Sequence, residues 1–405
     1  MQVAFFTDSY PPMRDGVAEI TGGLARTLVR LGVQVRVFAP NLTKGAPSEE
    51  SEENGVSIRR VRSVPVPLYG QYRWPLFPLG LVREARGVAE ADLLHVHSPG
   101  GIGSAGFLAS RRFGLPLVGT FHTNLREMAA SVPRKFLVPQ FFRIAWWWNL
   151  GLYWRCDVAT APSVAARSAL VGSVRKPFRR TVEIVPNGVD VARFGPGMRV
   201  PDWRVRCGLP PNPLVTYLGR LTVDKGVHRF LDAVADASEV TDLVAIIGGA
   251  GPEESAVRTR LAQDPRLSSR VRYIGPVAEE EKPALLSQTD LFVLPSTSDT
   301  SSVALLEAMA CGAAVVAPST GGAAELVQEG VTGRLVPMLE PGALPRAMTE
   351  LLADPAARRA LGARARDEVA RHASLETMAR RFISLYEHLL EARRVDGGRS
   401  AAGAR

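Results

Sequence analysis

The sequence has few cysteines and no long apolar run. Only three of its 405 residues are cysteines, and Cys156, Cys207 and Cys311 lie far apart with no Cys-x-x-Cys pair among them. This pattern argues against a disulfide framework and against a cysteine zinc site. No window approaches the roughly 18 consecutive apolar residues that a membrane-spanning helix requires, and no basic leader precedes the first apolar run. We therefore expect a cytoplasmic protein that starts at Met1.

The chain does contain enough apolar material for two domains. Hydrophobic residues make up 46% and charged residues 22% of the sequence, as in globular domains. The net charge of +9 is uneven, because residues 1 to 195 hold 24 Lys and Arg against 14 Asp and Glu, and residues 196 to 405 hold 25 against 26. We expect the basic first half to attract something anionic: nucleic acid, an acidic membrane surface or a phosphorylated substrate.

Short apolar runs alternate with longer helical patterns along the whole chain. We expect strands at residues 2–7, 33–39, 92–97, 116–122, 156–161 and 182–185, and again at 214–218, 243–248, 271–274, 291–294 and 313–317. Such alternation is typical of βαβ units, in which helices cover both faces of a parallel sheet. The sequence therefore predicts the α/β class, with two doubly wound, Rossmann-like domains.

The two series of strands are separated by a stretch rich in Pro, Gly and Asn, residues 186 to 213. Such composition is typical of a linker, so we expect an N-terminal domain over 1–195 and a C-terminal domain over 196–375. Residues 44–54 are polar and acidic and are predicted to form a loop. Residues 393–405, rich in Gly, Ala and Arg, are predicted to be a disordered tail.

Two loops that follow strands are suited to phosphate. The first ends at Gly16, which opens a helix whose backbone N–H groups can approach an anion, although a glycine needed only for the turn is the alternative. This loop lacks the Gly-x-Gly-x-x-Gly fingerprint. The second carries Arg220 and Lys225 between two glycines at a helix N-terminus, a set that suits a diphosphate, and a solvated turn is the alternative.

Two carboxylates follow the strand expected at 291–294. Asp299 lies in a polar loop, and Glu307 comes eight residues later in a helical pattern. Carboxylates after strands of such folds can hold vicinal hydroxyls, as an acidic residue holds a ribose in dinucleotide-binding folds. Helix capping by Asp299 is the alternative.

Three histidines end two other strands. His122 ends one of them, and it is expected either to contact the substrate or to make a structural hydrogen bond. His95 and His97 alternate on one strand, so their imidazoles point to one face as two metal ligands do. No third ligand is apparent, and we expect no metal site.

Several ordered motifs resemble those of retaining glycosyltransferases of family 4, which have the GT-B fold. The motifs are Phe121-His122-Thr123, Pro186-Asn187-Gly188-Val189-Asp190, Gly219-Arg220 with Lys225-Gly226, Glu307-Ala308-Met309-Ala310-Cys311-Gly312, Gly321-Gly322 with Glu325, and Gly330-Val331-Thr332-Gly333. The resemblance covers roughly residues 1 to 390. It implies two domains that face each other across a cleft, an acceptor-binding domain completed by a helix at about 376–392 and a nucleotide-sugar-binding domain. It also implies catalysis without a metal or other cofactor.

The resemblance implies that Arg220, Lys225 and the loop of Gly16 contact the donor diphosphate. Glu307 would hold the ribose of the nucleotide. Asp299 stands where the family usually has glutamate, and it would contact the transferred sugar. The customary Phe-Gly after it is Ser301-Ser302 here, which leaves the identity of the sugar open.

The resemblance also implies contacts at the two ends of the donor. His122 would lie beside the transferred sugar and the acceptor. Val277 and Glu279 would lie near the nucleobase, where a carboxylate can pair with the N–H donors of guanine.

Basic and aromatic residues are interleaved between residues 125 and 180. The basic residues are Arg126, Arg134, Lys135, Arg143, Arg155, Arg167, Arg175, Lys176, Arg179 and Arg180, and the aromatic ones are Phe136, Phe141, Phe142, Trp146, Trp147, Trp148, Tyr153 and Trp154. Such a mixture is typical of a helix in an anionic lipid interface, and a helix that packs its aromatics in the core is the alternative.

The sequence thus predicts a retaining hexosyltransferase that moves a mannose or glucose type sugar from a nucleotide diphosphate sugar, GDP-mannose or UDP-glucose. The acceptor is expected to be a membrane lipid at the inner membrane face, and a soluble carbohydrate acceptor is the alternative. We expect front-face displacement in which a leaving phosphate oxygen takes the acceptor's proton. A nucleic-acid-binding protein is the rival class, but the chain carries no RNA- or DNA-binding signature.

Overall fold

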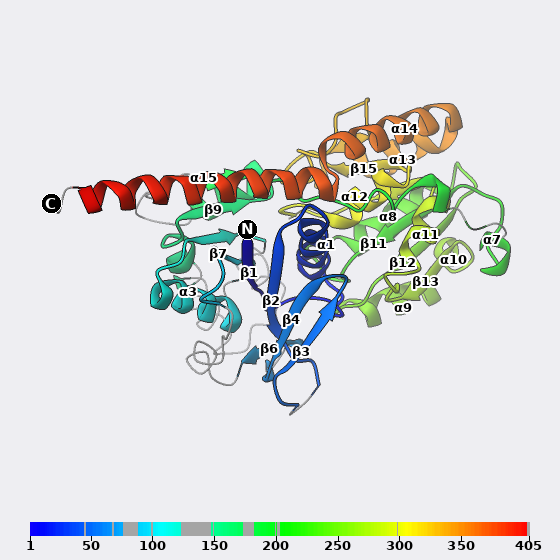
Figure 1. Ribbon diagram of the computed structural model, residues 1–405. Coiled ribbons are helices and arrows are strands. Elements are labelled where there is room, and N and C mark those ends of the chain that lie inside the picture. The colour runs from blue at the N-terminus through cyan, green and yellow to red at the C-terminus, as the bar shows by residue number, and fades with distance from the viewer. Residues whose placement is uncertain are drawn as a thin grey trace. The chain divides into compact units, whose positions relative to one another are not determined.

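The computed structural model describes residues 1–43, 46–66, 69–75, 88–98, 100–122, 147–148, 150–172, 182–198, 200, 203–297 and 299–402 (Figure 1). The chain divides into two compact units. Unit 1 consists of Met1–Asn187 and Leu375–Arg405, and unit 2 consists of Gly188–Ser374. The boundary therefore comes earlier than the expected residue 195, because Val189 and Phe194 are buried in the core of unit 2.

Within the described residues, unit 1 is built on an eight-stranded sheet in the order β10-β9-β8-β7-β1-β2-β4-β3. Its strands are β1 (Gln2–Phe6), β2 (Gln34–Pro40), β3 (Glu49–Glu53), β4 (Val56–Val61), β7 (Leu93–Val96), β8 (Leu117–Thr120), β9 (Val158–Ala161) and β10 (Val182–Ile184). All neighbours pair in parallel except β3 and β4. A separate hairpin is formed by β5 (Ser63–Val66) and β6 (Tyr69–Pro75). The central strands β1, β7 and β8 are buried along almost their whole length because helices cover both faces of a parallel sheet.

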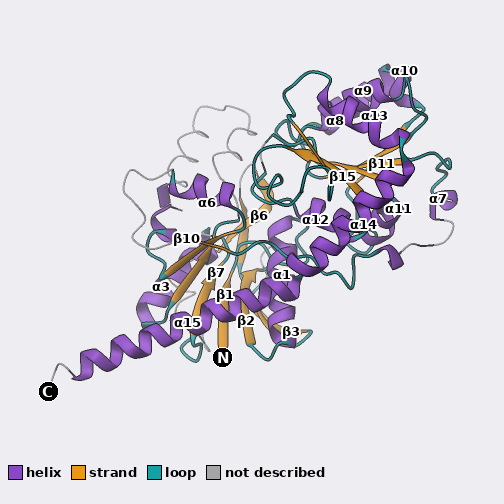
Figure 2. Cartoon of the chain, turned by 90° about the horizontal axis from the view of Figure 1, so that it is seen from above, coloured by secondary structure: helices purple, strands orange, loops and turns teal. Residues whose placement is uncertain are grey.

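Four described helices belong to unit 1: α1 (Gly16–Arg30), α3 (Gly101–Phe113), α6 (Val164–Val171) and α15 (Leu375–Ala402). The helix α1 buries Ile20, Leu24 and Leu28, which recur at helical spacing on one face. The helix α15 lies beside α1 (Figure 2), where the side chain of Leu375 occupies the space that a Cβ on Gly23 would need. The C-terminal helix thus completes the first unit.

Two segments that were expected to be irregular contain regular structure. The acidic segment 44–54 contains β3, because Glu49 and Glu50 pair across the sheet with Arg60 and Arg59, and Glu50 forms an ion pair with Arg59 at 2.8 Å. Residues 393–402 continue α15 instead of forming a disordered tail, and Arg393 in this extension contacts Gly114 O and Asp157.

Among the described residues, unit 2 is built on a six-stranded parallel sheet in the order β13-β12-β11-β14-β15-β16. The strands are β11 (Leu214–Leu218), β12 (Val244–Gly248), β13 (Val271–Gly275), β14 (Leu291–Val293), β15 (Ala314–Pro318) and β16 (Arg334–Val336). The helices are α7 (Trp203–Arg206), α8 (Val227–Ala237), α9 (Glu254–Gln263), α10 (Pro265–Ser268), α11 (Lys282–Gln288), α12 (Val303–Ala310), α13 (Ala343–Ala353) and α14 (Pro355–His372), with a 3-10 turn at Pro196–Met198.

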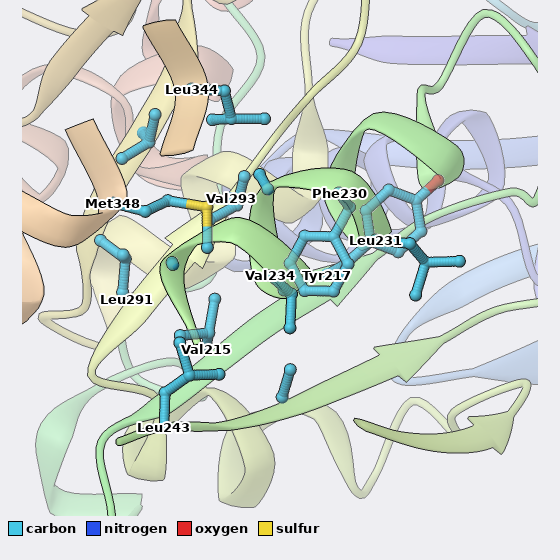
Figure 3. Close-up of a cluster of buried hydrophobic side chains, with 14 of the residues drawn as sticks. Val215, Tyr217, Phe230, Leu231, Val234, Leu243, Leu291, Val293, Leu344 and Met348 are labelled. Atoms are coloured by element: carbon cyan, nitrogen blue, oxygen red, sulfur yellow. The ribbon is translucent and has the colours of Figure 1, made fainter. Parts of the chain in front are cut away.

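Alternate residues of each strand in unit 2 enter different apolar cores. Val215 and Tyr217 of β11 pack with Phe230 of α8 and Met348 of α13 on one face (Figure 3). Residues of the opposite parity pack against α11, α12 and α14 on the other face. Helices on both faces therefore bury the central strands β11, β12, β14 and β15, as the sequence predicted.

The strand order reverses once in each sheet. In unit 2 the chain moves from β11 outward to β13 and then returns to the other side of β11 as β14. In unit 1 the corresponding reversal lies between β1 and β7. Open α/β sheets bind ligands at such points, beyond the carboxyl ends of the strands.

The described residues include no helix long and apolar enough to cross a membrane.

Candidate functional site

In unit 2, the loops after β11 and β12 are in backbone contact at the carboxyl edge of the sheet. The Leu221 N–H donates to Ala250 O at 2.9 Å. A Cβ on Gly249 would lie 1.9 Å from Gly219 O, and one on Gly251 would lie 2.3 Å from Leu221 O. Only glycine allows this approach, and the packing holds the exposed Arg220 on a fixed loop.

Lys225 and Asp299 meet where the strand order reverses. The Lys225 Nζ lies 2.9 Å from Asp299 Oδ2, and the two side chains are only 19% and 10% exposed. The loops that carry them are also joined through their backbones, because the Thr297 N–H donates to Asp224 O at 3.0 Å. Two residues predicted to contact the donor from separate loops are thus brought together.

Asp299 does not cap the following helix, contrary to the alternative considered for it. The N-cap of α12 is Ser302, whose Oγ accepts from the Leu305 N–H at 3.3 Å. The backbone of Asp299 is held instead by Gly322, whose N–H donates to Asp299 O at 2.8 Å. The carboxylate is therefore available for the ion pair with Lys225.

Glu307 is 2% exposed and faces a cation that the sequence-based prediction missed. The Lys282 Nζ lies 3.4 Å from Glu307 Oε1 and 2.5 Å from Glu279 Oε1. The other oxygen of Glu279 lies 3.3 Å from Arg193 Nη2. Glu279 lies in the turn before α11 and Lys282 is the first residue of that helix, and their spacing of three residues was the available signal in the sequence.

Val277 lies just after the end of β13 and shortly before Glu279. Its Cγ2 would be 2.7 Å from a Cβ on Gly248, so it packs directly against the last residue of β12. The predicted nucleobase residues Val277 and Glu279 therefore follow β13 and lie at the same sheet edge as the loop of Arg220.

Gly16 is the first residue of α1, but the phosphate contact expected there is not preformed. Asp15 caps the helix, and its Oδ1 accepts from the Val17 and Ala18 N–H groups at 2.9 and 3.0 Å. Its Oδ2 accepts from Ser9 Oγ at 2.5 Å. The Asp15 carboxylate thus accepts hydrogen bonds from backbone N–H groups of the first turn, which the sequence analysis expected to approach a phosphate.

Asp8 is a buried carboxylate that the sequence-based prediction missed. Its Oδ1 accepts from the Ile102 N–H at 2.9 Å at the N-terminus of α3. Gly100 makes room for it, since a Cβ there would lie 2.5 Å from Asp8 Oδ2. Burial raises the pKa of Asp8 from 3.8 to about 6, although backbone N–H groups of residues 100–103 act in the opposite direction.

The three histidines form one cluster in unit 1. The His122 Nε2 lies 3.2 Å from His97 Nδ1, and the rings of His95 and His97 are 3.9 Å apart. Burial lowers the pKa of His122 to about 4 and places those of His95 and His97 well below the usual value, so all three are neutral at pH 7. His95 bonds Tyr386 and Thr120, and the described residues contain no group of three metal-ligating side chains.

Most of the basic and aromatic residues between 125 and 180 lie outside the described residues. Among the described ones, Trp147 and Trp148 are 53% and 59% exposed. The Trp148 Nε1 donates to Ser104 Oγ at 2.9 Å. Tyr153 is buried and donates to Thr120 O at 3.0 Å. One aromatic of the set thus packs in the core, and two lie at the surface.

Comparison with known proteins places both units in glycosyltransferase families. The family model "Glycosyltransferase Family 4" matches residues 14–193, and "Glycosyl transferases group 1" matches residues 202–368. A GDP-mannose-dependent alpha-mannosyltransferase of Mycolicibacterium smegmatis is 32% identical over 377 residues, which are 91% of this chain and 92% of that protein. The protein of the same name from Mycobacterium tuberculosis is 30% identical over 84% of this chain and 85% of its own length.

Solved structures show the same architecture. Sucrose-phosphate synthase of Thermosynechococcus elongatus aligns with a TM-score of 0.76 over 97% of this chain and 100% of that chain, at 23% identity. The fold is therefore GT-B, with two parallel-sheet, Rossmann-like domains. The chain belongs to glycosyltransferase family 4 and is a hexosyltransferase that uses a nucleotide sugar.

Proposed function

We propose that the chain transfers mannose from GDP-mannose with retention of the anomeric configuration. The donor is that of the relatives named above. The observation that carries the proposal is the contact of Glu279 with Lys282 at 2.5 Å beside the buried Glu307. Guanine presents two adjacent N–H donors next to a carbonyl oxygen, so a carboxylate and an ammonium group side by side match its edge. Uracil has a single N–H between two carbonyls and fits this pair less well.

We assign the remaining donor contacts to residues at the same sheet edge. Arg220 and Lys225 hold the diphosphate, and Glu307 accepts hydrogen bonds from the ribose hydroxyls. Asp299 contacts the hexose. The support is the 2.9 Å contact between Lys225 and Asp299, because the diphosphate and the sugar are adjacent parts of one donor.

In the proposed mechanism, cations stabilise the leaving diphosphate while the acceptor attacks from the same face. Arg220 and Lys225 neutralise the charge that develops on the phosphate oxygen. That oxygen takes the proton of the acceptor hydroxyl as the glycosidic bond forms. His122 lies beside the sugar and contributes as a neutral imidazole, consistent with its pKa of about 4. The reaction uses no metal or other cofactor, so activity is expected to survive EDTA.

Thermal-shift measurements with GDP-mannose, GDP, UDP-glucose and UDP test the donor. A ligand at 100 times its Kd stabilises the folded state by about 2.7 kcal/mol. GDP-mannose and GDP are expected to raise Tm more than the uridine nucleotides at equal concentration, and Lys282→Ala is expected to remove that preference. Stabilisation by UDP-glucose alone would refute the guanine assignment.

We propose that the acceptor is a membrane lipid, which the protein reaches as a peripheral protein at the inner membrane face. The support is the exposure of Trp147 and Trp148 next to the basic stretch of the sequence, since tryptophan and cationic residues favour an anionic lipid interface. A soluble carbohydrate acceptor is the competing possibility.

A further inference from the structure

A hydrogen-bonded row of side chains connects α15 to the strands of unit 1. The Tyr386 hydroxyl lies 2.6 Å from His95 Nδ1, and His95 Nε2 lies 2.6 Å from Thr120 Oγ1. Thr120 Oγ1 lies 2.6 Å from Thr160 Oγ1 on the next strand. Both ring nitrogens of His95 are therefore engaged, and the ring is fixed in position and orientation.

The fixed ring of His95 supports the ring of His97. Their centroids are 3.9 Å apart, and Phe5 packs on His97 with a centroid distance of 4.4 Å. His97 is 1% exposed, so its imidazole is enclosed by buried neighbours. The remaining contact of His97 is with His122, whose Nε2 lies 3.2 Å from His97 Nδ1.

One of the two nitrogens in this contact must carry the proton, because two lone pairs at this distance repel each other. His97 Nε2 is buried and has no hydrogen-bond partner among the described residues. A proton on that nitrogen would bury an N–H group without an acceptor, which proteins avoid more strictly than an unpaired acceptor. The neutral imidazole of His97 therefore carries its proton on Nδ1 and donates to His122.

We propose that His97 is a positioning residue that holds His122 in the tautomer with the proton on Nδ1. The Nε2 of His122 is committed as an acceptor, so the other edge of the ring presents an N–H donor. A nitrogen that carries a proton is a donor, so that edge cannot accept a proton. If His122 lies beside the hexose, as the proposed function holds, it orients the sugar and leaves deprotonation of the acceptor to the phosphate oxygen.

The tautomer can be measured directly by long-range ¹H–¹⁵N correlation on protein labelled with ¹⁵N-histidine. The signals of His122 are identified by their loss in His122→Asn. In the native protein at pH 7.5 we expect His122 Nδ1 to have the shift of a protonated nitrogen and Nε2 that of a bare one. A protonated Nε2 would overturn the proposal. This readout needs no substrate, so it stands or falls separately from the donor assignment.

Two near-isosteric substitutions of His97 test its role. His97→Leu removes the donor, and His97→Asn keeps an N–H donor close to the position of Nδ1. We expect His122 to become a mixture of tautomers in the Leu variant and to keep Nδ1–H in the Asn variant. An unchanged tautomer in the folded Leu variant would overturn the proposal.

The two His97 variants are also expected to differ in kcat. His97→Leu is expected to lower kcat about tenfold or more, while the Tm shift produced by GDP stays unchanged, since the nucleotide contacts lie in unit 2. His97→Asn should recover most of the lost kcat. Equal kcat values for the two variants would show that the N–H donor has no role in positioning His122.

Discussion

Lys225 and Asp299 form an ion pair at the point where the strand order of unit 2 reverses, with Nζ and Oδ2 2.9 Å apart. The lysine proposed to hold the donor diphosphate is therefore neutralised by the carboxylate proposed to contact the hexose. A donor must compete with Asp299 for this ammonium group, so the pair sets the balance between binding the phosphates and binding the sugar.

Replacing Lys225 with alanine should abolish most of the transfer. We expect kcat/KM to fall several hundredfold or more, because the lost charge stabilises the leaving diphosphate. Steady-state kinetics measure the effect, with Arg258→Ala on the exposed surface of α9 as the control. Wild-type kinetics in Lys225→Ala would remove Lys225 from the mechanism.

Asp299→Asn should change nucleotide and sugar binding in opposite directions. Loss of the carboxylate releases Lys225, so we expect GDP to bind about three to ten times more tightly. Transfer should nevertheless slow, since the contact with the hexose is weakened. Calorimetric titration with GDP and a transfer assay give the two values. Weaker GDP binding in Asp299→Asn would show that the carboxylate supports the phosphate site.

Gly249→Ala should damage the donor site more than Gly275→Ala. The new Cβ at residue 249 would lie 1.9 Å from Gly219 O, whereas no atom lies within 4 Å of one at residue 275. Both glycines have positive φ, 142° at Gly249 and 73° at Gly275, so the control also carries backbone strain, on the order of 1 kcal/mol. We expect the donor KM to rise at least tenfold only in Gly249→Ala, and equal KM values would contradict the proposed role of the loop contact.

Asp8 should make stability depend on pH. Its pKa is raised from 3.8 to about 6 in the folded state, so between these values the folded protein binds more protons than the unfolded chain. Stability from this group is fully present below pH 3.8 and is lost as the pH rises through about 6, a change of about 3 kcal/mol.

The variant Asp8→Asn lacks this titration. Its free energy of unfolding relative to wild type should therefore rise between pH 4 and pH 7, as followed by urea denaturation at several pH values. A difference that stays constant over this range would show that Asp8 is not titrating there.

Trp147→Ala should weaken membrane association. A tryptophan that is 53% exposed contributes to lipid binding through its apolar ring, and Trp148 is tethered to Ser104. We expect less protein to co-sediment with anionic liposomes than in wild type, and Val240→Ala in unit 2 serves as an exposed apolar control. Equal sedimentation of the two variants would favour the soluble carbohydrate acceptor.

The sequence predicted the central strands well because parallel strands buried on both faces are short, continuous apolar runs. It missed β3, whose run of glutamates and serine lacks such a pattern and depends on pairing with Arg59 and Arg60 of β4. It also missed β4, β5 and β6 of unit 1, and β16, which has three residues and is defined by its pairing with β15. Strands that depend on a partner far along the chain leave little local signal.

The candidate site was predicted where residues follow strands, and less well where contacts cross between loops. Arg220, Lys225 and Asp299 were proposed as donor contacts because they lie in the loops after β11 and β14. The ion pair of Lys282 with Glu307 was not predicted, since it depends on how α11 packs against α12. The sequence analysis expected the backbone N–H groups at the start of α1 to face a phosphate, but Asp15 caps the helix and accepts hydrogen bonds from them.

The return of α15 to unit 1 has a consequence for synthesis on the ribosome. Unit 2 is one continuous segment, Gly188–Ser374, and can fold as soon as it has emerged. Unit 1 must wait for the end of the chain, because Leu375 fills the space beside Gly23 and Tyr386 bonds His95. A nascent chain that stops before α15 would thus carry a complete unit 2, to which we assign donor binding, while its histidine cluster still lacked Tyr386. Premature termination would therefore yield a protein without the contacts that order the histidine cluster.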